Sequence, residues 1–203
     1  MHERAGQSFL FFLLPFFAAC QFSGDPGIPA TEVDRIDVPA GSVALAHLMD
    51  SLHLDPRSIR FHVDKSEHRF DVIINDAVRK SYRCVLGEKP VGDKLHQGDR
   101  KTPEGEFTFR SKRAHDQWYK FIWVDYPNDE SWRRYRERQR EGLIPAGKDI
   151  GGEIGIHGVP DGMDHWIDAE ADWTWGCISL KNADVDEIYP YIIPKRTTIL
   201  ITP

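Results

Sequence analysis

Hydrophobic and polar positions alternate over much of the chain, and this pattern predicts a protein built mainly of β-strands. Residues 58–87 alternate and are rich in β-branched and aromatic side chains, with polar turns at 64–67 and 75–76. Two further strand patterns occupy residues 101–109 and 117–127. Such alternation is typical of strands that turn one face toward a core and the other face outward.

Three segments break the alternation and predict helices. Apolar residues recur at helical spacing over 42–54, residues 128–142 begin with acidic and end with basic side chains, and residues 182–192 start at a capping position, Asn182. Strand patterns return between and after the last two helices. Many strands with few helices indicate one mostly-β domain over residues 40–203.

The first forty residues differ from the rest and predict an export signal followed by a tether. Residues 9–19 are apolar, follow Arg4, and are too few to span a bilayer. The run ends at Cys20 after two alanines, which resembles the lipobox of bacterial lipoproteins, where the cysteine is acylated. We therefore expect a lipoprotein-type signal peptide at 1–19 and a flexible tether at 20–39. The alternative is an ordinary signal peptide with an incidental cysteine.

Gln21 adds an expectation about location. A residue other than Asp after the acylated cysteine resembles lipoproteins sent to the outer membrane of two-membrane bacteria. We expect the protein on the periplasmic side of the envelope, held at the membrane by its N-terminal lipid anchor.

Charge and cysteine content narrow the function classes. The 203 residues carry a formal net charge of −6, which argues against a nucleic-acid partner. Three cysteines cannot form a disulfide framework. Cys84 lies in an apolar strand pattern and is expected to be buried. The alternative is a Cys84–Cys177 disulfide, which would leave no free thiol at Cys177 to act as a nucleophile.

The best candidate nucleophile is Cys177, in the stretch DWTWGCISL. Gly176 before it would let the backbone turn so that the amides of both residues point toward an oxyanion. His157 ends an apolar strand pattern, and Gly158 after it would leave room for a substrate backbone. If the sheet pairs the two segments, the imidazole and the thiol come within hydrogen-bond reach, and the imidazole can generate the thiolate.

The order of motifs resembles the catalytic domain of bacterial L,D-transpeptidases. The motifs are VDKSEHRFDV, GDRKTPEGEFTF, IGIHG and TWGCISLKNADVDEIY, and the resemblance covers the chain from about residue 40 onward. It implies the family's β-sandwich with a few covering helices. His157 takes the place of the family's catalytic histidine, Cys177 that of its acylated cysteine, and Gly176 that of the neighbouring glycine.

The resemblance also implies a reaction, a two-step acyl transfer on peptidoglycan stem peptides through a thioester, which needs no metal or cofactor. The commonest family pattern reads Ser-His-Gly-Cys-Ile-Arg, and this chain departs from it at three positions. Thr174 stands for the serine, Trp175 for the second histidine and Ser179 for the arginine. We expect these three residues and Gly158 to contact substrate, with Trp175 as an aromatic wall or, equally, a core residue.

Several alternatives stay open. The same fold could hydrolyse stems or release a lipoprotein bound to them, because the family's arginine is replaced by Ser179. A non-catalytic, cell-wall-binding lipoprotein is a second alternative. A metal site from His157, His165 and Cys177 is a third, although the spacing fits no common zinc pattern. The five arginines of residues 133–140 form either a solvated helix face or a lid over an anionic substrate.

Overall fold

The structure, a computed structural model, describes residues 43–203. The predicted signal peptide at 1–19, the lipidation site Cys20 and the tether at 20–39 lie outside these residues. Within the described part, no helix is long and apolar enough to cross a bilayer.

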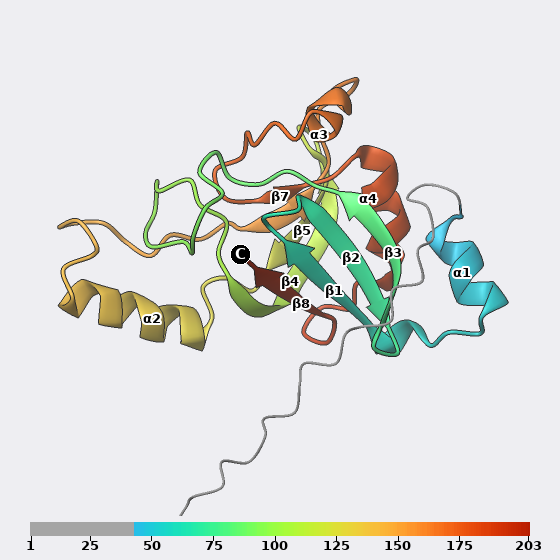
Figure 1. Cartoon of the computed structure of the whole chain (residues 1–203), viewed down its shortest axis with the longest axis horizontal. Coiled ribbons are helices and arrows are strands. Elements are labelled where there is room, and N and C mark those ends of the chain that lie inside the picture. The colour runs from blue at the N-terminus through green and yellow to red at the C-terminus, as the bar shows by residue number, and fades with distance from the viewer. Residues whose placement is uncertain (1–42) are drawn as a thin grey trace, which may run out of the picture. The chain divides into compact units, whose positions relative to one another are not determined.

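Residues 43–203 form eight strands, four α-helices and two short 3-10 helices (Figure 1). In chain order the elements are α1 (Leu45–Ser51), a 3-10 helix (Pro56–Ser58), β1 (Ile59–Asp64), β2 (Arg69–Ile74), β3 (Ala77–Arg83), β4 (Gly105–His115), β5 (Tyr119–Val124), α2 (Asp129–Arg140), β6 (Gly155–His157), α3 (His165–Asp168), β7 (Ile178–Ser179), α4 (Asn182–Ile188), a 3-10 helix (Tyr189–Tyr191) and β8 (Thr198–Thr202).

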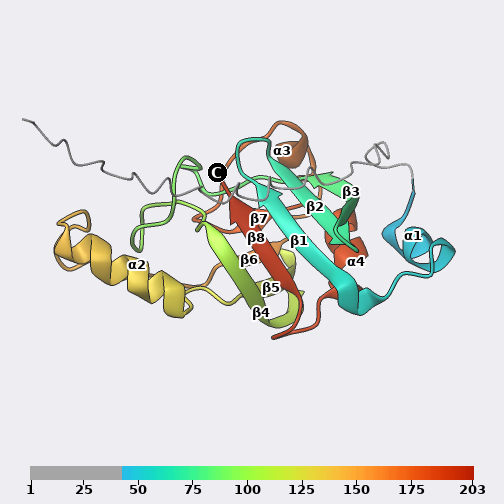
Figure 2. The ribbon, with the colours of Figure 1, turned by 60° about the horizontal axis from the view of Figure 1, so that its bottom comes forward.

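One hydrogen-bonded sheet contains all eight strands, in the order β3-β2-β1-β8-β4-β5-β6-β7. Its strands run antiparallel except for the β1–β8 and β6–β7 pairs, which are parallel. Figure 2 shows β1, β8 and β4 side by side. The first residues of β4 pair with β8 and the later ones with β5, and the register shifts between Phe109 and Ser111. The predicted mainly-β fold is therefore confirmed, and its two halves are continuous through β4.

The segment after β3 connects the two edges of the sheet, because it leaves β3 at one edge and pairs with β7 at the other. Val85 and Ser179 exchange backbone hydrogen bonds of 2.9 and 2.8 Å, and Gly87 forms a bridge with Thr174. Side chains of both halves of the curled sheet consequently pack into one core, where the Phe61 ring lies 5.2 Å from that of Phe70. This closure places the residues around position 177 against a rigid sheet.

The helices lie where the sequence predicts them, with two local differences. Helix α2 starts at the Asn128 cap, whose Oδ1 accepts the Ser131 N–H at 2.9 Å. Helix α4 begins at Asn182, but Asn182 is not its N-cap: Lys181 holds that position, and the Asn182 Oδ1 accepts the Val159 N–H at 3.0 Å. Helix α3 is an addition to the prediction, since its residues lack a helical apolar repeat.

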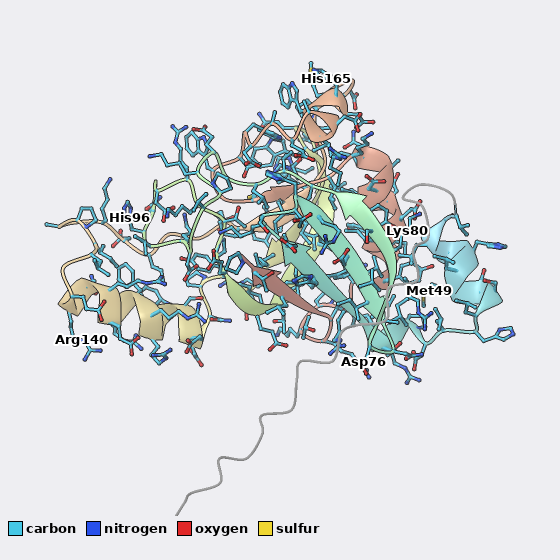
Figure 3. The ribbon with its side chains drawn as sticks, viewed as in Figure 1. Met49, Asp76, Lys80, His96, Arg140 and His165 are labelled. Carbon is cyan, nitrogen blue, oxygen red and sulfur yellow. The ribbon has the colours of Figure 1, made fainter. Side chains whose placement is uncertain are left out.

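The arginines of α2 mostly pair within the protein. Arg133 pairs with Glu130 and Glu137 at 2.6 Å each. Arg138 pairs with Asp93 at 2.7 Å and donates to the Lys94 carbonyl at 3.0 Å. In Figure 3, Arg140 marks the end of α2, and His96 lies on the loop that this helix supports. One role of α2 is therefore to hold the loop around Asp93.

Candidate active site

A cavity of about 800 Å³ contains both predicted catalytic side chains, Cys177 and His157. Its other walls come from four parts of the chain: the loop around Lys94 to Arg100, the β4–β5 hairpin, residues 151–154 and residues 173–175. Six aromatic rings line it: His115, Trp118, Phe121, Trp123, Trp173 and Trp175. The predicted site residues therefore lie in a concave environment rich in aromatic rings, of the kind that holds ligands.

The pairing of β6 with β7 explains how two residues so far apart in sequence meet. Ile156 lies beside Ile178 and His157 beside Ser179 in parallel register. Continuing this register back by one residue places Cys177 beside Gly155. Because side chains alternate along strands, Cys177 and His157 project to the same face, and Gly155 between them carries no side chain.

His157 is held in one tautomer and in one orientation. Its Nδ1 lies 2.7 Å from the Gly158 carbonyl, which can only accept, so Nδ1 carries the proton and Nε2 is a free base. The Phe121 ring stacks at 5.8 Å and the Trp118 ring at 5.1 Å, while Trp173 meets the imidazole edge-on at 5.4 Å. Only 2% of His157 is exposed. This burial lowers the pKa of His157 to about 4.

The Cys177 thiol is neutral in the free protein. Burial raises the pKa of Cys177 to about 11, against an opposing backbone hydrogen bond from Gly155. The Sγ–H donates to the Glu153 carbonyl at 3.4 Å. The predicted hydrogen bond between Cys177 and His157 does not occur among residues 43–203, so the two groups rest as thiol and imidazole rather than as an ion pair. Catalytic hydrogen bonds of this kind are often looser before substrate binds.

The turn before Cys177 is fixed by Thr174. Its Oγ1 donates to the Cys177 carbonyl at 2.7 Å and accepts the Gly176 N–H at 3.1 Å. The Gly176 amide is thus occupied in this structure, and its predicted role at an oxyanion stays a prediction. The Cys177 N–H has no acceptor among the described residues, so it is the one of these two amides that is free to donate to a ligand oxygen. Gly176 is needed for its φ of +128° and because a Cβ would lie 2.7 Å from the Lys101 carbonyl oxygen.

Two predicted substrate contacts lie behind the site and do not line the cavity. Ser179 is fully buried, and its Oγ donates at 3.2 Å to the Gly158 carbonyl, the same oxygen that His157 contacts. Gly158 leaves room for Asn182, whose Oδ1 would lie 2.0 Å from an added Cβ. Neither residue is exposed in the cavity, and their contact with substrate stays a prediction. They position the carbonyl that orients His157.

Trp175 lies on the cavity wall and is 75% exposed, so the alternative of a core residue was wrong. The Arg100 guanidinium stacks on its ring, 5.3 Å from the centroid, and Arg100 also pairs with Glu88. An exposed indole held in this way is a surface for ligand contact.

The β4–β5 hairpin supplies a wall that the sequence analysis missed. Arg113, His115, Trp118, Phe121 and Trp123 all line the cavity. The sequence does contain a pattern that could have indicated this wall, the aromatic residues at alternate positions 119, 121 and 123. Alternate residues of a strand project to one face, and this face is turned toward the Cys177 segment. That face could not be assigned without knowing that β5 pairs with β6.

The remaining candidates lie elsewhere. Cys84 is unpaired and fully buried in the core, and burial raises the pKa of its thiol. His165 lies on α3 and does not line the cavity (Figure 3). Within residues 43–203, no cluster of three or more His, Cys, Asp or Glu side chains is arranged to hold a metal ion. Helix α2 does not line the cavity either, and in this structure it is not a lid.

Solved structures that resemble this one come from several bacteria. The helical cell shape determining protein Pgp2 from Campylobacter jejuni is 23% identical, with a TM-score of 0.50 over 71% of this chain and 47% of that chain. Bd1075 from Bdellovibrio bacteriovorus is 21% identical, with a TM-score of 0.48 over 71% of this chain and 48% of that one. L,D-transpeptidase 3 from Mycobacterium tuberculosis is 13% identical, with a TM-score of 0.48 over 72% and 61%.

The alignments cover about half the length of the first two structures. At 23% identity, the match to Pgp2 establishes the fold alone. None of the curated proteins matches the chain. The model of the YkuD family, the L,D-transpeptidase catalytic domain, matches residues 58–201, which is more than half of the chain. The chain therefore belongs to the L,D-transpeptidase catalytic-domain (YkuD) family.

Proposed function

We propose that the protein is a cysteine-dependent acyltransferase that acts on peptidoglycan stem peptides through a thioester. The observation that carries the proposal is the shared placement of Cys177 and His157 on one face of β6 and β7, at one cavity. Family membership supports the substrate class. The tautomer fixed by the Gly158 carbonyl supports His157 as the base.

In the first step, the Cys177 Sγ bonds to the carbonyl carbon of the scissile amide while the thiol proton moves to His157 Nε2. The Cys177 N–H stabilises the resulting oxyanion. As the tetrahedral intermediate collapses, the C–N bond breaks and His157 returns its proton to the departing amine. The thioester remains on Cys177. The depressed pKa of His157 leaves the imidazole unprotonated at neutral pH but also makes it a weak base in the free protein, so the proton transfer is coupled to formation of the carbon–sulfur bond.

In the second step, an acceptor attacks the thioester and the thiol is regenerated. An amine gives a new cross-link, and water gives a shortened stem, so transpeptidase and hydrolase differ only in the acceptor. We favour transfer to an amine because the matching family model is that of the L,D-transpeptidase catalytic domain.

We further propose that this chemistry takes place on the periplasmic side of the envelope, with the protein anchored through an acylated Cys20. The apolar run at 9–19 and the alanines before Cys20 support this proposal. Metabolic fatty-acid labelling should depend on Cys20. Equal labelling of wild type and Cys20→Ser would refute the anchor.

The decisive experiment incubates the protein with a defined tetrapeptide stem, with and without an amine acceptor, and follows both protein and peptides by mass spectrometry. Wild type and Cys84→Ser should gain one acyl adduct, and Cys177→Ser should gain none. A cross-linked product identifies transfer, and a tripeptide formed in its place identifies hydrolysis. A folded wild-type protein that neither acylates nor turns over would support the non-catalytic cell-wall-binding alternative.

A further inference from the structure

Three cations line the cavity, and two of them are neutralised. Lys94 is buried and pairs with Asp99 at 2.7 Å. Arg100 pairs with Glu88 and stacks on Trp175. Arg113 has neither an ion pair nor a hydrogen-bond partner among residues 43–203, although it stands on the same wall as the aromatic rings. Its charge is therefore the one that the cavity leaves available.

The Arg113 side chain is nevertheless located by its surroundings. Its guanidinium lies over the Trp123 ring, 4.8 Å from the centroid. Trp123 in turn donates its Nε1–H to the Glu153 carboxylate at 2.8 Å, and the Glu153 carbonyl accepts the Cys177 thiol. A short chain of contacts thus links the guanidinium to the nucleophile. Stacking on an indole occupies the face of a guanidinium and leaves its N–H edge free for a planar anion.

The strand register places Arg113 close to the catalytic base as well. Arg113 pairs with Phe121 across β4 and β5, and Phe121 pairs with His157 across β5 and β6. The three residues therefore form one row across the sheet. A ligand that reaches Cys177 and continues along this row meets Arg113.

We infer that Arg113 and Trp123 form a carboxylate-binding subsite for the acyl donor. This inference rests on the proposed function, because stem peptides carry free carboxylates. The family's commonest pattern has an arginine where this chain has Ser179, and Ser179 is buried behind His157. Arg113 reaches the cavity from β4 instead, so it selects acyl donors whose carboxylate lies on the β4 side of the cavity.

The test compares a stem peptide that has a free C-terminal carboxylate with the same peptide amidated at that position. Wild type should prefer the carboxylate form. Arg113→Gln should raise KM for it by roughly tenfold or more, with little change in kcat, and should abolish the preference between the two peptides. Arg113→Lys should keep part of the preference. The matched control is Arg110→Gln, because Arg110 lies on the same strand but pairs with Asp125 outside the cavity.

Binding to Cys177→Ala, measured by calorimetry, separates this inference from the proposed function. If the double variant Cys177→Ala/Arg113→Gln binds the carboxylate peptide more weakly than Cys177→Ala does, the subsite is supported even if the wild-type protein shows no turnover. An unchanged preference in Arg113→Gln, in turnover and in binding alike, would overturn the inference and leave Arg113 as a solvated side chain.

Discussion

The burial of His157 predicts a specific loss of stability in mild acid. The imidazole is 2% exposed and its pKa falls from 6.5 to about 4. Below pH 6.5, His157 therefore binds a proton in the unfolded chain, whereas in the folded protein it binds one only below about pH 4. Each pH unit inside this window lowers the free energy of unfolding by about 1.4 kcal/mol. Above pH 6.5 the effect vanishes, because both states are then neutral.

Between pH values near 7.5 and near 5, the contribution of His157 amounts to about 2 kcal/mol. Urea unfolding at the two pH values measures the total loss, and the same measurement on His157→Gln removes this one contribution while the other titrating groups remain. We expect the loss to be smaller in the variant by that amount. An NMR titration of the wild-type ring gives an independent readout, with a midpoint near 4. A midpoint near 6.5, or equal losses in both proteins, would refute the reasoning.

Two further predictions concern residues behind the site. Gly155→Ala places a Cβ 2.4 Å from the Phe121 ring, so we expect chemical denaturation to show that the free energy of unfolding falls by about 1–3 kcal/mol. Gly152→Ala is the control and should be near neutral, because the nearest atom to its Cβ lies at 3.9 Å. Equal effects of the two substitutions would contradict the packing argument. Ser179→Ala removes one donor to the Gly158 carbonyl, which should slow acylation of Cys177 without changing KM; a raised KM with unchanged acylation would instead indicate contact with substrate.

Much of the fold follows from local patterns in the sequence. The alternation through Phe61, Phe70 and Phe107 predicts strands because each pattern is buried on one face, and Asn128 with its acidic neighbours predicts the start of α2. The two-residue strand β7 and the four-residue helix α3 are too short to carry a pattern of their own. They form because their neighbours hold them.

The site was predictable only in part for a similar reason. Cys177 and His157 stand out because glycine neighbours mark both of them, and one sheet pairing brings them together. Ser179 shares the strand parity of Cys177 and lies beside His157, yet the chain around Gly158 buries it, which residue type does not reveal. Gly158 shows the same difficulty, since its missing side chain accommodates Asn182 rather than a ligand.

The position of β8 has a consequence for the order in which the domain can form. Residues 198–202 lie at the centre of the sheet, between β1 from the start of the domain and β4. The parallel partner of β1 is β8, which is synthesised only after nearly the whole domain. Closing the long loop between these two strands makes assembly slow. The core that β8 shares with β6 and β7 is incomplete until this loop is closed, because it contains Ile199 and Ile201. The strands that carry His157 and Cys177 therefore join a finished sheet only after residues 198–202 have paired with β1 and β4.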